Sequence, residues 1–288
     1  MLRIKQGSKL TKLCLFVLCG LAIHTNPALS QSSNGTLYLI GSTSASIVVA
    51  ADSLVVKIAE PPSTNEKLMP LGDAGVCFIT GRSVIGSTGD ADKLDLNKAV
   101  IAWIKEHPKA NLPDAYASMD ATLLSLMKAH RNKHPKWYSM LAKEFSSFTC
   151  VGYYVALPKI YLGQYNATPD GITNNTSLNG NRLVPFAAAG QGRVCLEITK
   201  GKTTQTLSRF KNEPAVVKYR KAAQSKNFAS ISTNDLLLLS RICLEATESA
   251  EGRAFDPDAK YVGPPNRYAV IEDRGGFKWV DPPGRPHQ

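Results

Sequence analysis

The stretch Ile47-Val48-Val49-Ala50-Ala51-Asp52-Ser53 constrains the fold more than any other part of the chain. Its β-branched run, followed by two alanines, predicts a buried strand that ends at an acidic residue. Residues 36–41 form a second β-rich run, and the small polar residues 42–45 between the two runs favour a turn. We therefore expect the chain to enter its first sheet through a β-hairpin that spans residues 36–52.

Strand and helix patterns alternate in blocks along the rest of the chain. The order is strands, two helices, strands, two helices and strands, which favours two sheets covered by helices in one domain over a series of βαβ units. Asn234 is the expected N-cap of the last helix. The predicted strands are 75–81, 148–164 with a turn at 157–158, 184–189, and a hairpin of 268–272 with 277–280; the predicted helices are 94–107, 113–131, 214–224 and 234–249; residues 166–183 are expected to form a loop or a hairpin tip.

The composition excludes several classes of protein. Of the 288 residues, 20% are charged, and 21 Gly with 17 Pro is ordinary usage, so neither a disordered chain nor a collagen-like repeat fits. The length suffices for one large domain with a sizeable core. Six Cys are too few for a scaffold built on disulfides.

The first thirty residues have the features of a signal peptide. Four basic residues precede the apolar run 13–23, and Ala28-Leu29-Ser30 supplies small residues for cleavage after Ser30. An uncleaved anchor is the alternative, but eleven apolar residues are too few to cross the hydrocarbon core. Cleavage lowers the formal net charge from +11 to +7, because it removes four positive charges and no negative ones. We expect an exported protein, periplasmic or extracellular, that has no membrane contact after signal removal.

Four cysteines remain after the expected cleavage. No spacing among them identifies pairs, and each has apolar neighbours, so disulfides and buried free thiols both remain open. They are Cys77, Cys150, Cys195 and Cys243.

Familiar catalytic motifs are missing from the sequence. Gly81-Arg82-Ser83 does not begin a nucleophile elbow, because Ile85 occupies the position of the last glycine. No metalloprotease helix motif, paired C-x-x-C or P-loop occurs. His130 and His134 have helical i, i+4 spacing, but they lie in a basic stretch, 128–136, that is better explained as a solvated surface than as a metal or nucleic-acid site.

Four positions share the register of a known family. Gly35-Thr36 precedes the first strand, Asp52 ends the second sixteen positions later, Lys67 opens the next apolar stretch, and Gly81 closes the strand after it. Together with the Ala-Ala-Asp-Ser signature, these residues resemble the N-terminal half of proteasome β-subunit-like N-terminal-nucleophile (Ntn) hydrolases. Lys67 and Gly81 fit the family spacing if one residue is deleted from the 54–66 loop. The run 262–265 and the closing hairpin resemble the family's C-terminal glycine-turn and strands.

The resemblance implies an α+β fold, a four-layer αββα sandwich of two packed, mainly antiparallel sheets. It covers most of residues 35–280. The implied organisation is a signal peptide at 1–30, a short propeptide-like extension at 31–35, and a single domain at 36–282 with an insertion near 193–230. The hairpin lies centrally in this arrangement, and the two pairs of helices cover opposite faces.

The resemblance also implies a catalytic chemistry that uses no metal and no organic cofactor. Self-cleavage of the Gly35–Thr36 bond frees an α-amine, which takes the proton of the Thr36 hydroxyl. Lys67 lowers the pKa of that amine and stabilises the developing alkoxide, while Asp52 keeps Lys67 charged and oriented. The N–H of Gly81 faces the oxyanion. The implied activity is hydrolysis of a peptide or small amide through an acyl-enzyme on Thr36, and family members form rings, so a homo-oligomer is expected.

Other interpretations stay open. Taken one at a time, each residue also has an ordinary structural explanation. Threonine is common as the first residue of a strand, an aspartate such as Asp52 can cap a turn, and a lysine such as Lys67 can be a charge at the edge of a strand. Gln191 and Val262 stand where active family members place serine. A catalytically inactive subunit that keeps its N-terminal extension and acts in binding or assembly is therefore the second hypothesis. A basic surface-binding module driven by the +7 charge is the third.

Overall fold

The computed structural model describes residues 36–55, 63–64, 67–86, 91–141, 144–177, 180–182, 185–200 and 205–281. The predicted signal peptide and the extension at 31–35 lie outside this part of the chain. All the described residues belong to one compact unit. Among the described helices, none combines the length and the apolar character that crossing a bilayer requires.

The predicted N-terminal hairpin lies in the centre of a five-stranded antiparallel sheet. Strand β1 (Leu37–Ser42) pairs with β2 (Ser46–Asp52), and the order of the sheet is β13-β1-β2-β14-β15. Every residue of β2 is buried, because the strand has neighbours on both edges and packed layers on both faces. The remaining strands are β13 (Phe186–Gly190), β14 (Asn266–Glu272) and β15 (Gly276–Trp279), which confirms the predicted closing hairpin.

A second, six-stranded antiparallel sheet has the order β11-β10-β9-β6-β5, with β12 beside β10. Part of the segment 166–183 forms β11, which pairs with the end of β10, so the hairpin alternative for this segment is the one observed. The strands are β5 (Met69–Leu71), β6 (Gly75–Gly81), β9 (Glu144–Tyr154), β10 (Leu157–Thr168), β11 (Gly171–Thr176) and β12 (Asn181–Arg182); two small sheets pair β3 (Leu54–Val55) with β4 (Ser63–Thr64) and β7 (Val84–Ile85) with β8 (Leu94–Asp95).

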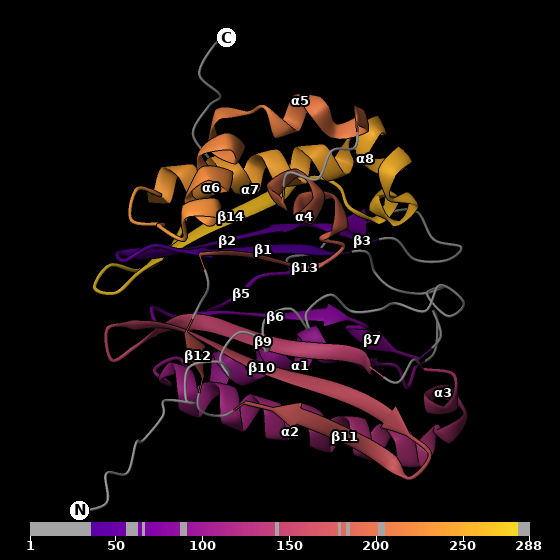
Figure 1. Ribbon diagram of the computed structural model, residues 1–288. Coiled ribbons are helices and arrows are strands. Elements are labelled where there is room, and N and C mark those ends of the chain that lie inside the picture. Colours follow the sequence, from indigo (N-terminus) through magenta and orange to yellow (C-terminus); the bar gives the residue numbers. More distant parts are fainter. Residues whose placement is uncertain are drawn as a thin grey trace, which may run out of the picture. The chain divides into compact units, whose positions relative to one another are not determined.

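Helices pack on one face of each large sheet (Figure 1). The four predicted helices form as α1, α2, α6 and α7. Four further helices have between four and eight residues, too few for a periodic pattern to reveal them. The bounds are α1 (Leu96–Glu106), α2 (Leu112–Lys133), α3 (Pro135–Ser139), α4 (Arg193–Lys200), α5 (Ser208–Lys211), α6 (Pro214–Ser225), α7 (Thr233–Glu248) and α8 (Ala250–Phe255), with 3-10 turns at Gln205–Leu207 and Pro257–Tyr261.

The predicted N-cap of α7 is wrong. The helix begins at Thr233, and its N-cap is Ser232 rather than Asn234. The Ser232 hydroxyl accepts the N–H of Asp235 at 3.2 Å, while the Asp235 carboxylate accepts the N–H of Ser232 at 2.8 Å. This reciprocal capping box satisfies two N–H groups at once, an arrangement that Asn234 does not make.

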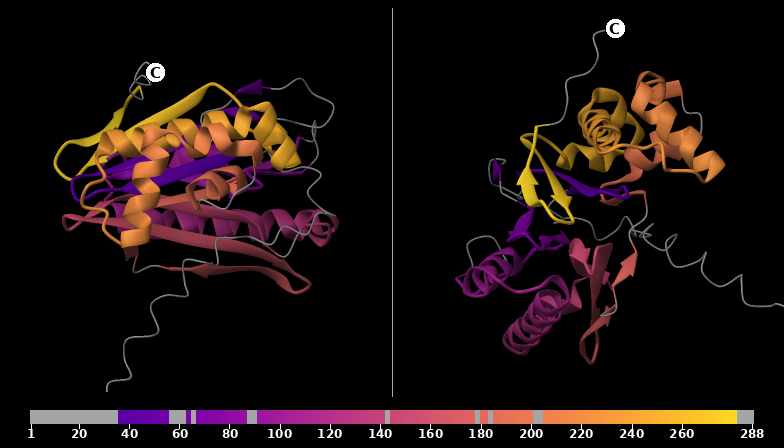
Figure 2. Two further views of the ribbon diagram at one scale, coloured as in Figure 1. Left: turned by 45° about the horizontal axis from the view of Figure 1, so that its top comes forward. Right: turned by 90° about the vertical axis from the view of Figure 1, so that its left-hand side faces the viewer.

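Three buried apolar clusters hold the layers together. One lies between the five-stranded sheet and helices α4, α6 and α7; it includes Leu39, Val48 and Leu236. A second lies between the six-stranded sheet and helices α1 and α2. The third joins the two sheets through residues such as Tyr38 and Phe78, whose rings stack with their centroids 4.3 Å apart. The two sheets thus face each other, and the helices cover their outer sides (Figure 2).

The four cysteines form two disulfides. Cys77 of β6 bonds to Cys150 of β9, its direct cross-strand neighbour, and Cys195 of α4 bonds to Cys243 of α7. All four are fully buried. The free-thiol alternative is therefore not the one observed, and each bridge lies inside one of the buried apolar clusters.

Candidate active site

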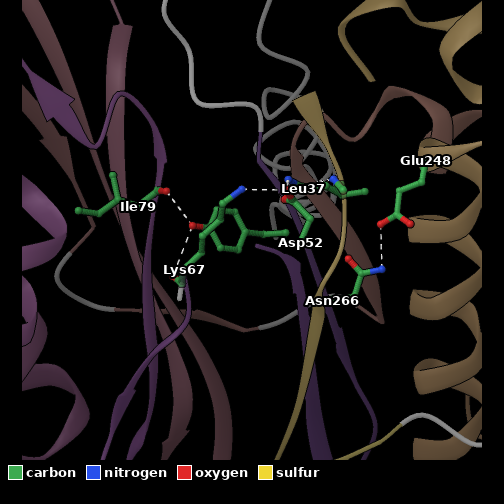
Figure 3. Close-up of polar contacts among 8 residues, drawn as sticks. Leu37, Asp52, Lys67, Ile79, Glu248 and Asn266 are labelled. Atoms are coloured by element: carbon green, nitrogen blue, oxygen red, sulfur yellow. Dashed lines mark hydrogen bonds and ion pairs between the residues drawn. The ribbon is translucent and has the colours of Figure 1, made fainter. Parts of the chain in front are cut away.

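The carboxylate of Asp52 is the centre of the candidate site. Asp52 is the last residue of β2 and is fully buried. Its Oδ1 accepts the backbone N–H of Leu37 at 2.7 Å, and its Oδ2 accepts the ammonium of Lys67 at 2.9 Å (Figure 3). The backbone N–H of Gly263 lies 3.5 Å from Oδ2. Three donors from three distant segments therefore converge on one carboxylate, which makes its burial tolerable.

Lys67 enters the site from the segment directly before β5. Its side chain is 4% exposed, and its nitrogen points between the two sheets toward Asp52. The hydroxyl of Tyr38 donates to the carbonyl oxygen of Ile79 at 3.0 Å and lies 3.4 Å from that of Lys67. Tyr38 of β1 thus fixes the backbone of Lys67 and β6 relative to the strand that begins beside Thr36.

Burial shifts the pKa values of the buried ion pair in opposite directions. It raises the pKa of Asp52, and the charge of Lys67 with the N–H groups of Leu37 and Gly263 opposes that rise. Burial also lowers the pKa of Lys67, and the charge of Asp52 opposes that change. The pKa of Asp52 is therefore raised and that of Lys67 is lowered, and in each residue the charge of the partner opposes the effect of burial.

Thr36 is the first residue that the structure describes, and it borders this network. It is 6% exposed, and its carbonyl oxygen accepts the N–H of Gln191 at 2.8 Å. A side chain at Gly190 would overlap that carbonyl oxygen, so this position requires glycine. The next N–H along the chain, that of Leu37, donates to Asp52. The peptide group between Thr36 and Leu37 is therefore held by two hydrogen bonds, one at its carbonyl oxygen and one at its N–H, directly at the start of β1.

Gly81 ends β6 at the same end of the sheets. Its φ is +79°, a conformation that favours glycine. Arg82 donates its N–H to the carbonyl oxygen of Phe145 at 2.8 Å, and bonding groups alternate between the two edges of an antiparallel strand. The N–H of Gly81 therefore points away from β9, to the edge where Ile79 accepts the hydroxyl of Tyr38. That edge faces Lys67.

Sequence reasoning missed two residues behind Asp52. Asn266 pairs with Asp52 in the β14–β2 register, and its amide donates to the carboxylate of Glu248 at 2.8 Å. Figure 3 shows this pair on the side of Asp52 away from Lys67. Burial raises the pKa of Glu248. No local signal marks either residue, because their partnership depends on how α7 packs on the five-stranded sheet.

The remaining predicted positions lie elsewhere or make other contacts. Val262 is fully buried in the apolar cluster beside α7. His130 contacts the hydroxyl of Tyr138 at 2.9 Å and the carbonyl oxygen of Asp92 at 2.8 Å, so its ring nitrogens are occupied. In the part of the chain that the structure describes, no group of three or more His, Cys, Asp or Glu side chains is arranged to hold a metal ion.

Comparison with known proteins bears on the fold. No protein-family model matches the chain, and no curated protein matches it. Among solved structures, the chain is similar to one described as the helical assembly of the Anbu complex from Pseudomonas aeruginosa. The TM-score is 0.51 and the sequence identity is 15%, over 85% of this chain and 86% of that chain. At this identity the likeness concerns the arrangement of strands and helices.

Proposed function

We propose that the chain is an exported, proteasome-like Ntn hydrolase with the four-layer αββα fold, which hydrolyses amide bonds through an acyl-enzyme on Thr36 after removal of residues 1–35. One observation carries the proposal: the carboxylate of Asp52 binds the N–H of Leu37 and the ammonium of Lys67 simultaneously, at 2.7 and 2.9 Å. This contact links the residue after the proposed nucleophile to the proposed catalytic lysine. The fold shared with the Anbu complex supports the assignment.

The proposed reaction begins with cleavage of the Gly35–Thr36 bond, which frees the α-amine of Thr36. That amine takes the hydroxyl proton while the Thr36 oxygen attacks the substrate carbonyl carbon. The N–H of Gly81 binds the oxyanion that forms, and Lys67 stabilises the alkoxide. The carbon–nitrogen bond then breaks, the leaving amine takes the proton, and the acyl group remains on the oxygen as an ester. Water hydrolyses the ester, releases the acid and restores the hydroxyl.

A second candidate is an inactive subunit that retains its N-terminal extension. In the full chain Thr36 is 6% exposed, which leaves little room for a substrate carbonyl at its hydroxyl. While residue 35 remains attached, Thr36 also lacks a free amine. This candidate would act in binding or assembly, and the helical assembly named for the similar structure supports a homo-oligomer in either case.

N-terminal sequencing and intact mass of the exported protein test the proposal. The active enzyme starts at Thr36, whereas the inactive form starts at Gln31 in fully folded protein. The Thr36→Ala variant should stay unprocessed and lose amide hydrolysis, and Thr36→Ser should keep part of both, because serine retains the hydroxyl. Unchanged hydrolysis in Thr36→Ala across a panel of peptide amides would reject the proposed nucleophile.

A further inference from the structure

Strand β13 lies at one edge of the five-stranded sheet, and β1 is its only partner among the strands that the structure describes. On the side of β1, the carbonyl oxygen of Pro185 and the N–H of Gln191 form hydrogen bonds of 3.2 and 2.8 Å. Bonding groups alternate between the two sides of an antiparallel strand, so the N–H and C=O groups of Phe186 and Ala188 point to the other side. The strand, Phe-Ala-Ala-Ala-Gly, has no charge and no proline that would hinder the addition of a further strand.

A pocket of about 340 Å³ lies beside β13 and is lined by that strand and by helices α4 and α6. The rings of Phe186 and Tyr219, whose centroids lie 5.6 Å apart, line it together with Leu196. All three side chains are half-buried. A pocket of this size with an apolar lining suits one or two apolar side chains of a ligand. Phe186 presents its ring to the pocket and its backbone groups to the edge of the sheet, so one extended peptide can use both.

The same pocket carries positive charge. Lys200, at the end of α4, and Arg220, on α6, line it. Neither forms an ion pair with a carboxylate of the described residues. In the sequence, the segment 193–226, which includes α4, α5 and α6, holds nine Lys and Arg against two Glu. This surplus equals the whole net charge of +7 that is expected after removal of residues 1–30. The charge favours an acidic ligand.

We propose that an extended, acidic peptide segment of a partner protein binds here as an added strand beside β13. The backbone groups of Phe186 and Ala188 bond to the peptide backbone, an apolar side chain of the peptide enters the pocket, and flanking carboxylates lie beside Lys200 and Arg220. A nucleic acid or an anionic lipid surface would use the positive charge but not the backbone groups of the strand, so the combination favours a peptide. The proposed interaction does not involve the Asp52–Lys67 pair and does not depend on hydrolysis.

A blocked, fluorescently labelled peptide of sequence EEVFVEE tests this inference by fluorescence anisotropy with the full chain. At about 0.15 M salt, we expect it to bind at least about tenfold more tightly than KKVFVKK, which has the opposite charge. Two further EEVFVEE peptides carry N-methyl groups on opposite edges of the strand. One should lose binding and the other keep it, because only one edge of an added strand bonds to β13. Equal binding of these two peptides, or tighter binding of an oligothymidylate than of EEVFVEE, overturns the inference.

Variants of the full chain locate the binding site. Lys200→Glu should weaken binding of EEVFVEE by about fivefold or more. Ala223→Trp should abolish it, because this exposed residue of α6 lines the pocket and an indole would fill the pocket. Lys221→Glu is the matched control, an equal change of charge on α6 outside the pocket lining, and should weaken binding by less than about twofold. Equal effects of the two charge reversals overturn the inference. A change of oligomeric state in Ala223→Trp, with no peptide binding to the wild type, assigns the surface to a second copy of the chain and also overturns it.

Discussion

The carboxylate of Asp52 lies 2.9 Å from the ammonium nitrogen of Lys67, with the two side chains 0% and 4% exposed. An ion pair this deeply buried is a weak source of stability, because desolvating both charges offsets their attraction. The pair is better explained by the groups that it positions. The same carboxylate accepts the backbone N–H of Leu37, the residue after Thr36. Asp52 therefore fixes the position of Lys67 relative to the start of β1.

The first prediction concerns the coupling between these two residues. Asp52→Asn should lower the free energy of unfolding by about 3–5 kcal/mol, because it leaves the ammonium of Lys67 buried without its counter-charge. The double variant Asp52→Asn/Lys67→Met should recover part of that loss. Urea unfolding of the four proteins in a double-mutant cycle measures the coupling. Simple additivity of the two single changes would contradict the buried contact.

The pair should also give stability an unusual pH dependence relative to the Asp52→Asn/Lys67→Met variant. Burial holds the folded pKa of Asp52 above its unfolded value of about 3.9. Between those values the folded state binds more protons, so relative stability falls as pH rises. Burial holds the folded pKa of Lys67 below about 10.4, so between those values the folded state binds fewer protons and relative stability rises with pH. We expect the difference in urea midpoint between the wild type and this variant to fall with pH at the acidic end and to rise with pH at the basic end of the range from about pH 3 to about pH 11. A difference that does not change with pH would contradict both shifts.

Gly81→Ala should destabilise the protein by about 1–3 kcal/mol. The added Cβ would lie 2.6 Å from the carbonyl oxygen of Phe145, and φ at this position is +79°. The backbone shift that relieves this clash should also displace the N–H that we assign to the oxyanion. The rate of amide hydrolysis by the folded variant should therefore fall, in addition to any loss caused by unfolding. Gly171→Ala is the matched control, because its Cβ would meet nothing within 4 Å. Equal behaviour of the two variants would show that the backbone at Gly81 is not constrained.

The two disulfides predict the state of the four cysteines in the purified, oxidised protein. A thiol reagent applied in urea without reductant should find none of Cys77, Cys150, Cys195 and Cys243 reactive. Replacing Cys77 and Cys150 together by alanine should cost about 2–5 kcal/mol, because the bridge closes a long loop in the unfolded chain. Thermal unfolding with and without reductant provides the comparison. Four reactive thiols in urea without reductant would exclude both bridges.

Helix α7 offers a test of its capping. Ser232→Ala should lower the free energy of unfolding by about 1 kcal/mol, because it removes the hydroxyl of the capping box. Asn234→Ala should change stability by less than about 0.5 kcal/mol, since Asn234 lies inside the first turn. A larger loss in Asn234→Ala would restore the sequence-based assignment of the cap.

Local patterns predicted much of the fold. The hairpin of β1 and β2, strand β6 and helices α1, α2, α6 and α7 lie where alternation and periodicity placed them. These elements are long enough for one face to show in the sequence. Short helices such as α4 left no such pattern, although its residues Val194 and Ile198 are fully buried.

By itself, the sequence determined that a buried strand ends at Asp52. It also fixed the order in which Thr36, Asp52, Lys67 and Gly81 occur along the chain. Chain order cannot bring groups together, because contacts between distant segments depend on how the layers pack. Only the tertiary structure decided that Gly263, 211 positions from Asp52, adds a donor to its carboxylate, and that Cys77 faces Cys150.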